Sequence, residues 1–394
     1  MPVTIKELLK RGVKEIIERK HLEKALKSGK KLRVKHGVDP TTPELHLGYA
    51  VVYEKLRQFQ ELGHKIVFLI GDFTARFGDP TQQKKTRKLR SRKEVQKIAK
   101  NYISQLEKIL DIKKLEIRYN GEWYDKMSAE ELLQLMSHFT IQRMLERDMF
   151  QERMKKHQEI ALHEPVYPTL QAYDSVMLKS DLTVIGTDQK FNELQARMLQ
   201  RKMGQDPQDL VIMPLLIGTD EKRKMSQNLG NYIGINESAH EQYGKIMSIP
   251  DNIIIHYFEL LTHIPDQEIR EMKMDLQESR INPRDLKARL AREIVTIYHS
   301  RKEAIEAEKE FERIFKEKKK PSKVKSYKLK VKSWKLPDLL LKLKLVSSKS
   351  EARRLIEQGG VKINDKVIKD WKKKIQVKKD TIIQVGKRKF AKIK

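Results

Sequence analysis

The 394-residue sequence contains no cysteine, which excludes disulfide bonds, cysteine-ligated zinc and thiol catalysis. It also lacks any run of 18 apolar residues, and residues 1–20 form an amphipathic pattern without the apolar core of a signal peptide. We therefore expect a cytoplasmic protein that has no membrane partner. A chain of this length is long enough for two or three domains, each with its own core.

Acidic residues are scarce near the C-terminus. Residues 321–394 hold 24 Lys and Arg but 6 Asp and Glu, so they carry +18 of the formal net charge of +29. A surface rich in lysine and glutamate is typical of thermophilic proteins, but that enrichment raises both signs together. The shortage of acids in this part of the chain therefore favours a nucleic-acid partner, bound through its phosphates.

The hydrophobic pattern alternates between strands and helices up to residue 234. It predicts strands over 33–38, 66–70, 114–119, 182–189 and 211–217. It predicts helices within 1–30, from residue 46 onwards, over 93–110, over 167–178, after residue 189 to residue 203, and along the methionine-rich run 127–154. We expect an α/β fold with a parallel sheet in residues 1–234, an α-helical domain in 235–318, a linker in 319–335 and a small α+β domain in 336–394.

The motif His46-Leu47-Gly48-Tyr49 lies where the helix after the first strand begins. A helix N-terminus attracts anions through its free backbone N–H groups and its dipole, so an imidazole there is well placed to face a phosphate. Gly48 lets a flat ring approach the backbone closely. On its own, the motif is also typical of a helix-capping loop with a surface histidine.

A second motif, Lys222-Arg223-Lys224-Met225-Ser226-Gln227-Asn228, follows the last predicted strand. Together the two motifs resemble the HIGH and KMSKS signatures of class I aminoacyl-tRNA synthetases. The segments GVDPTTPELHLGY, GDFTARFGDP, YPTLQAYD, GTDQKFN and KMSQNLGNYIGI also occur in the order and spacing of the tyrosyl-tRNA synthetase family. This resemblance covers roughly residues 30–394.

The resemblance implies a Rossmann-type catalytic domain that joins L-tyrosine to AMP and then transfers the tyrosyl group to tRNA(Tyr). ATP would enter as its Mg²⁺ complex, with no protein-bound metal. Negative charge grows on phosphate oxygens during the attack, and positioned donors and cations stabilise it. The catalytic residues implied are His46, Gly48, Thr41, Lys222, Lys224 and Arg87, and those implied for ATP binding are His46, Gly48, Asp188, Gly186, Lys224 and Met225. A homodimer is also implied, with residues 127–154 as the candidate interface.

The residues implied for tyrosine binding include three that share one helix face, Tyr167, Gln171 and Asp174. By resemblance, Tyr167, Gln171 and Asp79 hold the ammonium group, and Asp174 accepts the phenolic hydroxyl. A buried carboxylate that awaits an O–H donor rejects phenylalanine, because that hydrogen bond would go unmade. The other residues implied are Gln189 at the carboxylate end, Lys35, Gly37 and Asp39.

Three positions depart from the family pattern. Tyr49 replaces the second histidine of HIGH, and Gln227 and Asn228 replace the lysine and serine that end KMSKS. Lys35 stands where many relatives have a tyrosine that touches the substrate hydroxyl. We expect Lys35 to pair with Asp174 or to donate to the phenolic oxygen.

The C-terminal residues 336–394 predict two short helices, a turn at Gly359-Gly360, and strands over 361–364 and 381–385. This pattern resembles the S4 RNA-binding domain, whose RNA-facing positions correspond to Ser350, Arg353, Arg354 and Lys362. Two other functions remain open at this point. One is a tryptophanyl-tRNA synthetase, and the other is a catalytically weak RNA-binding protein derived from a synthetase, which the KMSQN sequence favours.

Overall fold

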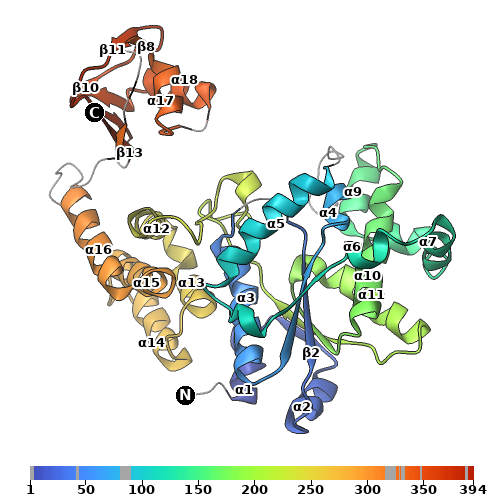
Figure 1. Cartoon of the computed structure of the whole chain (residues 1–394). Coiled ribbons are helices and arrows are strands. Elements are labelled where there is room, and N and C mark those ends of the chain that lie inside the picture. Colours follow the sequence, from blue (N-terminus) through green and yellow to red (C-terminus); the bar gives the residue numbers. More distant parts are fainter. Residues whose placement is uncertain are drawn as a thin grey trace. The chain divides into compact units, whose positions relative to one another are not determined.

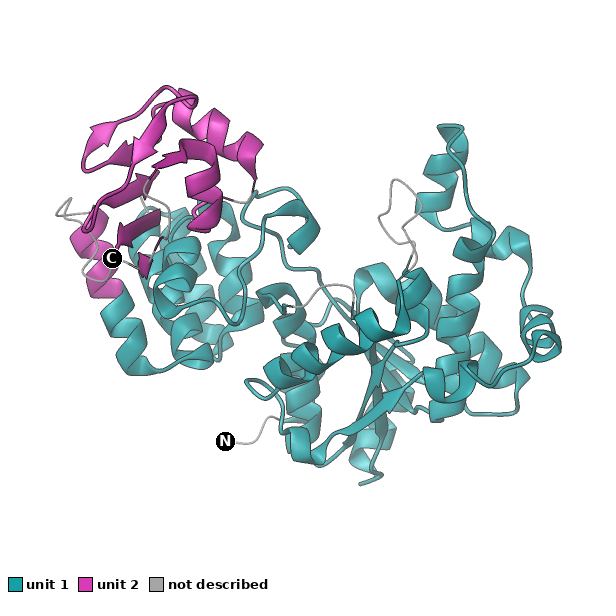
Figure 2. Cartoon of the chain, turned by 45° about the horizontal axis from the view of Figure 1, so that its top comes forward, with its two compact units in different colours: residues 1–307 teal, residues 308–394 magenta. Residues whose placement is uncertain are grey.

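The chain divides into two compact units, residues 1–307 (unit 1) and residues 308–394 (unit 2), shown in Figure 2. The structure is a computed structural model that describes residues 4–40, 44–79, 90–315, 325–327, 329, 333–346, 348–386 and 389–394. The boundary expected after residue 234 falls inside unit 1, and the division into catalytic and helical domains stays a prediction. Within the described ranges, no helix is long and apolar enough to cross a membrane.

A six-stranded sheet in the order β1-β6-β5-β2-β3-β4 forms the centre of unit 1 (Figure 1). Its parallel strands are β2 (Arg33–Val38), β3 (Lys65–Ile70), β4 (Glu116–Tyr119), β5 (Leu182–Gly186) and β6 (Asp209–Met213). β3, β5 and β6 are almost entirely buried, as expected for strands covered on both faces. This arrangement confirms the predicted α/β class.

Helices cover both faces of this sheet. In Figure 1, α3 (Leu47–Glu61) and α5 (Arg92–Leu106) lie on one side, and α10 (His163–Leu178) and α11 (Lys190–Lys202) lie on the other. α10 and α11 also pack against each other. The shorter helices of this region are α1 (Ile5–Leu8), α2 (Arg19–Lys27), α4 (Thr74–Phe77) and α6 (Gly121–Tyr124).

Several expectations about the elements of unit 1 were wrong in detail. β4 begins at Glu116 rather than at residue 114, and β5 ends at Gly186, before a 3-10 turn over 187–189. Residues 15–17 form β1 (Glu15–Ile17), an antiparallel strand on β6 rather than part of a helix. β6 ends at Met213 and not at residue 217, because Pro214 cannot donate a hydrogen bond to a neighbouring strand. The run 127–154 forms three helices, α7 (Ala129–Met136), α8 (Ile141–Leu145) and α9 (Asp148–Lys155), the first two capped by Ser128 and Thr140.

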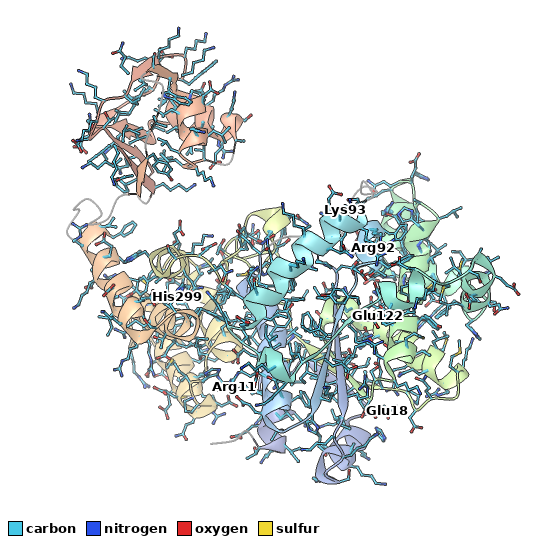
Figure 3. The ribbon with its side chains drawn as sticks, in the orientation of Figure 1. Arg11, Glu18, Arg92, Lys93, Glu122 and His299 are labelled. Atoms are coloured by element: carbon cyan, nitrogen blue, oxygen red, sulfur yellow. The ribbon has the colours of Figure 1, made fainter. Side chains whose placement is uncertain are left out.

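The predicted helical run after residue 240 is confirmed. It consists of α12 (Ala239–Ile246), α13 (Ile254–Leu261), α14 (Asp266–Gln277), α15 (Pro283–Tyr298) and α16 (Arg301–Phe315). Arg11, labelled in Figure 3, ties the N-terminal segment to these helices. Its guanidinium donates to the carbonyl oxygens of Thr262 and Ile264, each at 2.6 Å, in the loop between α13 and α14.

Unit 2 contains the two predicted helices, α17 (Leu336–Lys342) and α18 (Lys349–Glu357), and the two predicted strands, β9 (Val361–Ile363) and β12 (Ile382–Val385). Unit 2 also contains strands that were not predicted from the sequence, namely β7 (Lys325–Tyr327), β8 (Ser333–Lys335), β10 (Lys366–Val367), β11 (Lys374–Gln376) and β13 (Lys389–Ile393). The helices and strands share one apolar core that includes Leu336, Leu340, Ile356 and Ile383. Unit 2 is therefore a small α+β unit with a core of its own.

Candidate active site

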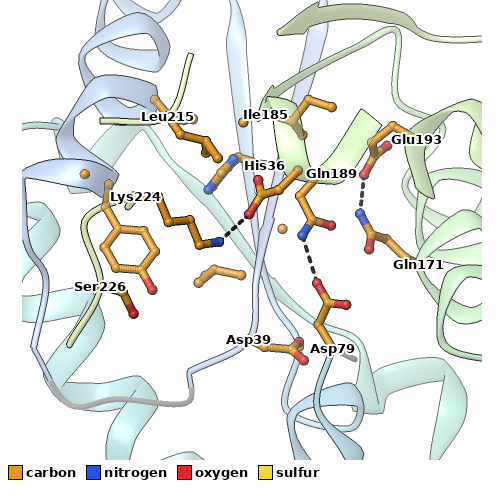
Figure 4. Close-up of a pocket in the computed structure, with 18 of the residues that line it drawn as sticks. His36, Asp39, Asp79, Gln171, Ile185, Gln189, Glu193, Leu215, Lys224 and Ser226 are labelled. Atoms are coloured by element: carbon orange, nitrogen blue, oxygen red, sulfur yellow. Dashed lines mark hydrogen bonds and ion pairs between the residues drawn. The ribbon is translucent and has the colours of Figure 1, made fainter. Parts of the chain in front are cut away.

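The carboxyl ends of β2, β3, β5 and β6 surround a pocket of about 360 Å³ (Figure 4). Parallel α/β sheets bind their ligands at this edge, and the volume suits a small molecule. Most of the predicted site residues line the pocket: Lys35, Gly37, Asp39, His46, Gly48, Asp79, Tyr167, Gln171, Asp174, Gly186, Asp188, Gln189, Lys224 and Met225. Lys222 is exposed and is not part of the lining. Thr41 and Arg87 lie outside the described residues.

The two sequence motifs meet beside this pocket. The backbone N–H of Leu47 donates to the carbonyl of Ile233, and that of Ile235 donates to Leu45, both at 2.9 Å. The side chain of Gln227 donates to the carbonyl of Glu44 at 2.8 Å. The glutamine that replaces a lysine of KMSKS therefore helps to hold this loop against the start of α3.

His46 caps α3, with its ring nitrogen Nδ1 accepting from the backbone N–H of Gly48 at 3.1 Å. Burial, together with the positive charge of Lys224, lowers the pKa of His46 to about 3. The ring is therefore neutral at pH 7, and its proton is on Nε2, which remains a donor. A Cβ at position 48 would come within 2.9 Å of the His46 ring, so glycine is needed there.

Lys224 carries the cation of the KMSQN loop into the pocket. Its Nζ donates to Asp188 Oδ2 at 2.7 Å, an interaction drawn in Figure 4. The next residue, Met225, is buried, and its backbone N–H donates to the carbonyl of Leu216 at 2.7 Å. The loop therefore places a lysine between the start of α3 and the end of β5, where it can reach a phosphate.

Asp174 lies buried in the pocket wall on α10. The indole N–H of Trp123 donates to its Oδ1 at 3.1 Å, and Asn120 donates to its Oδ2 at 3.4 Å. Burial raises the pKa of Asp174 to about 7, and this rise is partly opposed by the positive charge of Lys35 and by these donors. Asp174 thus offers a carboxyl group whose orientation is fixed by neighbouring side chains.

Asp39 is a second carboxyl in the lining, and it is partly buried. It accepts from the hydroxyl of Thr74 at 2.7 Å and from that of Tyr167 at 2.9 Å. Burial raises the pKa of Asp39 to about 7, and the nearby carboxylates of Asp79 and Asp174 raise it further against the effect of the two hydroxyl donors. The bond to Asp39 fixes the Tyr167 ring in the pocket.

Polar side chains connect the remaining lining residues. Gln189 donates to Asp79 at 2.8 Å, and Asn192 donates to both Gln189 and Gln171 at 3.0 and 2.7 Å. Gln171 in turn donates to Glu193 at 2.7 Å (Figure 4). One hydrogen-bonded chain therefore runs from Asp79 to Glu193.

Lys35 does not pair as expected. Its buried ammonium donates to both carboxylate oxygens of Glu193 at 3.0 Å and to the Ser175 hydroxyl at 2.5 Å, so its ion-pair partner is Glu193 rather than Asp174. Both carboxyl groups are buried, but only Glu193 lies within hydrogen-bond distance of the ammonium, and the donors that orient Asp174 are Asn120 and Trp123.

Sequence reasoning missed Glu193, Asn120, Trp123 and the nearly buried Arg147, whose guanidinium lies 3.7 Å from Asp79. For Glu193 the sequence did contain one signal. Glu193 falls four residues after Gln189, the N-cap of α11, so both residues can face the pocket at the start of this helix. Nothing in the local pattern pointed to Asn120 or Trp123, because their contacts to Asp174 depend on the arrangement of β4 and α10.

The predicted RNA-facing residues of unit 2, namely Ser350, Arg353, Arg354 and Lys362, are all exposed. The guanidinium of Arg353 stacks over the ring of Trp371 at 4.4 Å. Figure 3 shows many nitrogen-tipped side chains projecting from this unit. The exposed cations give unit 2 a surface suited to phosphate contacts.

The family model for class I tRNA synthetases (W and Y) matches residues 27–316, and the S4 domain model matches residues 334–382. The chain belongs to the class I tRNA synthetases of this W and Y family. Two relatives of this synthetase, both named tyrosine–tRNA ligase, come from Carboxydothermus hydrogenoformans and Thermotoga maritima. The first is 49% identical and the second 46% identical, and the alignments cover 98% of this chain and 97% and 96% of theirs.

Solved structures agree with this assignment. The synthetase superposes on a C-terminally truncated mitochondrial tyrosyl-tRNA synthetase from Aspergillus nidulans with a TM-score of 0.63 at 25% identity, covering 78% of this chain and 93% of that one. The tyrosyl-tRNA synthetase from Archaeoglobus fulgidus, complexed with L-tyrosine, gives a TM-score of 0.61 at 22% identity over 76% of this chain and 98% of its own. At the latter identity the likeness concerns the fold alone.

Proposed function

We propose that this synthetase is a tyrosine–tRNA ligase, which activates L-tyrosine with ATP and transfers it to the 3′-terminal adenosine of tRNA(Tyr). The observation that carries the proposal is the buried Asp174, an acceptor suited to a phenolic hydroxyl, in the same pocket as His46 and Lys224. Relatives named tyrosine–tRNA ligase, aligned over nearly the whole chain, support it.

Activation requires the tyrosine carboxylate to attack the α-phosphate of ATP while pyrophosphate leaves. In our proposal, Nε2–H of the neutral His46 and the ammonium of Lys224 stabilise the negative charge that grows on the phosphate oxygens. Asp188, which pairs with Lys224 at 2.7 Å, would accept from the ribose, and Gly186 and Gly48 would leave room for the nucleotide. Mg²⁺ would arrive with ATP, and the described residues contain no group of three or more His, Cys, Asp or Glu side chains able to hold a metal ion.

Recognition of the amino acid would use two regions of the pocket. Asp174 would accept from the phenolic O–H at one end, and Tyr167, Gln171 and Asp79 would surround the ammonium group at the other. Phenylalanine has no hydroxyl, so it would leave a buried carboxyl without its partner. Tryptophan would place a larger indole where the phenol fits, with its N–H donor at a different position from the phenolic hydroxyl.

The exposed basic residues of unit 2, Ser350, Arg353, Arg354 and Lys362 among them, would bind tRNA(Tyr) through its backbone. The match of residues 334–382 to the S4 domain supports this role. The substrates ATP and tRNA fit work in the cytoplasm.

We also propose that the chain is a homodimer, with a subunit interface around α7, α8 and the start of α10. This region carries large exposed apolar side chains, with Leu133 65% exposed and Leu162 89% exposed. Beside them lies a cavity of about 570 Å³ that is mostly apolar and is lined by residues such as Phe77, Met136, Ile141 and Leu162. Sedimentation should give a dimer for the native chain and a monomer for a Leu133→Glu/Leu162→Glu variant. A native monomer would exclude this interface.

Tyrosine-dependent exchange between ATP and pyrophosphate tests the ligase assignment directly. We expect exchange with L-tyrosine and little with L-tryptophan or L-phenylalanine. Exchange with tryptophan alone would make the chain a tryptophanyl-tRNA synthetase. Absence of exchange with every amino acid, together with retained tRNA binding, would make it an RNA-binding protein of synthetase origin.

A further inference from the structure

Glu193 is a carboxylate that is 1% exposed, in the first turn of α11 at the back of the pocket. It accepts hydrogen bonds from Gln171 at 2.7 Å, from Gln208 at 2.7 Å and from Lys35 at 3.0 Å. These donors come from α10, from the loop before β6 and from β2. A buried charge with this many donors is fully compensated, so its position is well defined.

The carboxylate restricts how Gln171 presents its amide. An ionised carboxylate accepts hydrogen bonds and cannot donate them, so the NH₂ group of Gln171 must face Glu193. The carbonyl oxygen of Gln171 must then face away from Glu193, where Asn192 donates to it at 2.7 Å. A carbonyl oxygen still has a second lone pair and attracts a cation.

Lys35 is the cationic partner of this carboxylate. Its ammonium is 1% exposed, pairs with both oxygens of Glu193 and donates to Ser175. An ammonium that donates to both carboxylate oxygens holds Glu193 as an acceptor, which is the condition that constrains the amide of Gln171. Lys35 thus acts on Gln171 through Glu193.

We infer that Glu193 is a positioning residue for the amino-acid substrate, because it turns the carbonyl oxygen of Gln171 towards the substrate ammonium group, with Lys35 as its counter-ion. This inference rests on the proposed function, which places an α-amino acid in the pocket next to Gln171. It assigns Lys35 a role that differs from contact with the phenolic oxygen. It also predicts that loss of Glu193 weakens recognition of the ammonium group in particular.

The test variant is Glu193→Gln, which has nearly the same shape but can donate as well as accept. We expect the Kd for L-tyrosine, measured by calorimetry, and its KM in exchange to rise by about tenfold, with kcat changed by less than about threefold. The matched control is Asp209→Asn. Asp209 is a carboxylate, 2% exposed, with His21 at 2.9 Å and Arg197 at 3.8 Å, and it does not line the pocket. This control should bind tyrosine like the native chain.

The ligand deaminotyrosine, which lacks the ammonium group, separates positioning from general damage. The Kd of deaminotyrosine should be nearly the same for the native chain and for Glu193→Gln, although that of tyrosine differs. Equal weakening of both ligands would show that the substitution disturbs the whole pocket, and it would overturn the inference. Unchanged tyrosine affinity in Glu193→Gln would overturn it as well.

A double variant, Lys35→Met with Glu193→Gln, addresses the ion pair as a purely structural element. Glu193→Gln alone leaves the ammonium of Lys35 buried without its counter-ion, so it should lower the melting temperature. Removing both charges should restore the melting temperature, because no unpaired ion remains buried. Tyrosine affinity should stay about tenfold weak, since nothing constrains Gln171, while deaminotyrosine should bind normally. Recovery of tyrosine affinity together with stability would refute the positioning role.

The outcomes for the native chain keep this inference apart from the proposed ligase function. Tyrosine binding without exchange would refute ligase activity and leave the Glu193 comparison decisive on its own. A native chain that binds no tyrosine by calorimetry would refute both.

Discussion

In the proposed function, the pocket of unit 1 and the basic surface of unit 2 would recognise their ligands in opposite ways. In the pocket, the carboxyl groups of Asp174 and Glu193 are buried and that of Asp39 is partly buried, and each is held by two or more side-chain donors. In unit 2, the candidate RNA contacts Arg353 and Arg354 are exposed cations on one helix. A small rigid substrate would therefore bind to side chains that hold one another in place. A nucleic acid would bind to charges that act almost independently.

The difference predicts how each region responds to substitution. Removing one side chain of the pocket leaves its buried partners without a hydrogen bond. Single substitutions there should therefore cause large losses of binding free energy, and the losses from two substitutions should not add. Removing one exposed cation loses a single screened contact, so changes in unit 2 should be modest, should add and should depend on salt.

The largest effect should come from Lys224→Ala. Loss of the cation that faces the phosphates should lower kcat for tyrosine-dependent exchange by about a hundredfold. The matched control is Arg223→Ala in the same loop, whose side chain is 57% exposed and pairs with Asp220. That control should retain nearly full activity. Equal losses in both variants would mean that the loop acts through its overall charge, as unit 2 is expected to do.

Asp174→Asn should come next. An amide at this position offers an N–H as readily as an oxygen, so selection of tyrosine over phenylalanine, measured as a ratio of kcat/KM values, should fall by more than about tenfold. Asp39→Asn changes a partly buried carboxyl of similar pKa that is bonded to Tyr167 instead, and it should lower tyrosine affinity with a smaller loss of selectivity. Unchanged selectivity in Asp174→Asn would remove this residue from the phenol end.

In unit 2, Arg353→Glu with Arg354→Glu should weaken tRNA binding by about tenfold at moderate salt and reduce the slope of log K against log salt by about 2. Tyrosine activation should be unaffected. The control Lys6→Glu with Lys10→Glu makes the same charge change at exposed positions on and just after α1. Equal loss of tRNA affinity in the control would indicate an effect of net charge alone, without a specific RNA surface in unit 2.

The smallest effect concerns pH. Burial raises the pKa of Asp39 and Asp174 from 3.8 to about 7, so between about pH 4 and 7 the folded chain keeps protons that the unfolded chain has released. These two groups therefore make stability fall as pH rises through this window. Asp174→Asn removes one of them, so the difference in melting temperature between pH 5 and pH 8 should be smaller in the variant. An equal difference would mean that Asp174 is ionised throughout.

The sequence predicted the parts of the fold that local pattern determines. The apolar runs that became β3, β5 and β6 and the face shared by Tyr167, Gln171 and Asp174 are properties of short segments. β1 was missed because three residues carry too little periodicity and form a strand by pairing with β6. The breaks between α7, α8 and α9 were missed because an apolar stripe hid the capping residues Ser128 and Thr140.

In the site, too, short sequence motifs were predictive, whereas contacts between distant segments were not. Motif resemblance predicted many of the residues that line the pocket, although Lys222 is not among the lining residues. It did not predict that Lys35 pairs with Glu193, since the two residues are 158 positions apart and meet only after β2 and α11 pack together. Lys35 also departs from the family pattern, so no relative's partner could be carried over to it.

The pairing of β1 with β6 has a consequence for synthesis of the chain. Residues 15–17 leave the ribosome early, but their partners at 210–212 follow only after nearly the whole of the sheet has been made. The carbonyls that Arg11 holds are made later still, at residues 262 and 264. The N-terminal segment must therefore wait, unpaired, for more than half of translation, whereas unit 2 pairs strands that are near neighbours in time. Newly made unit 1 should depend on chaperones more than unit 2 does.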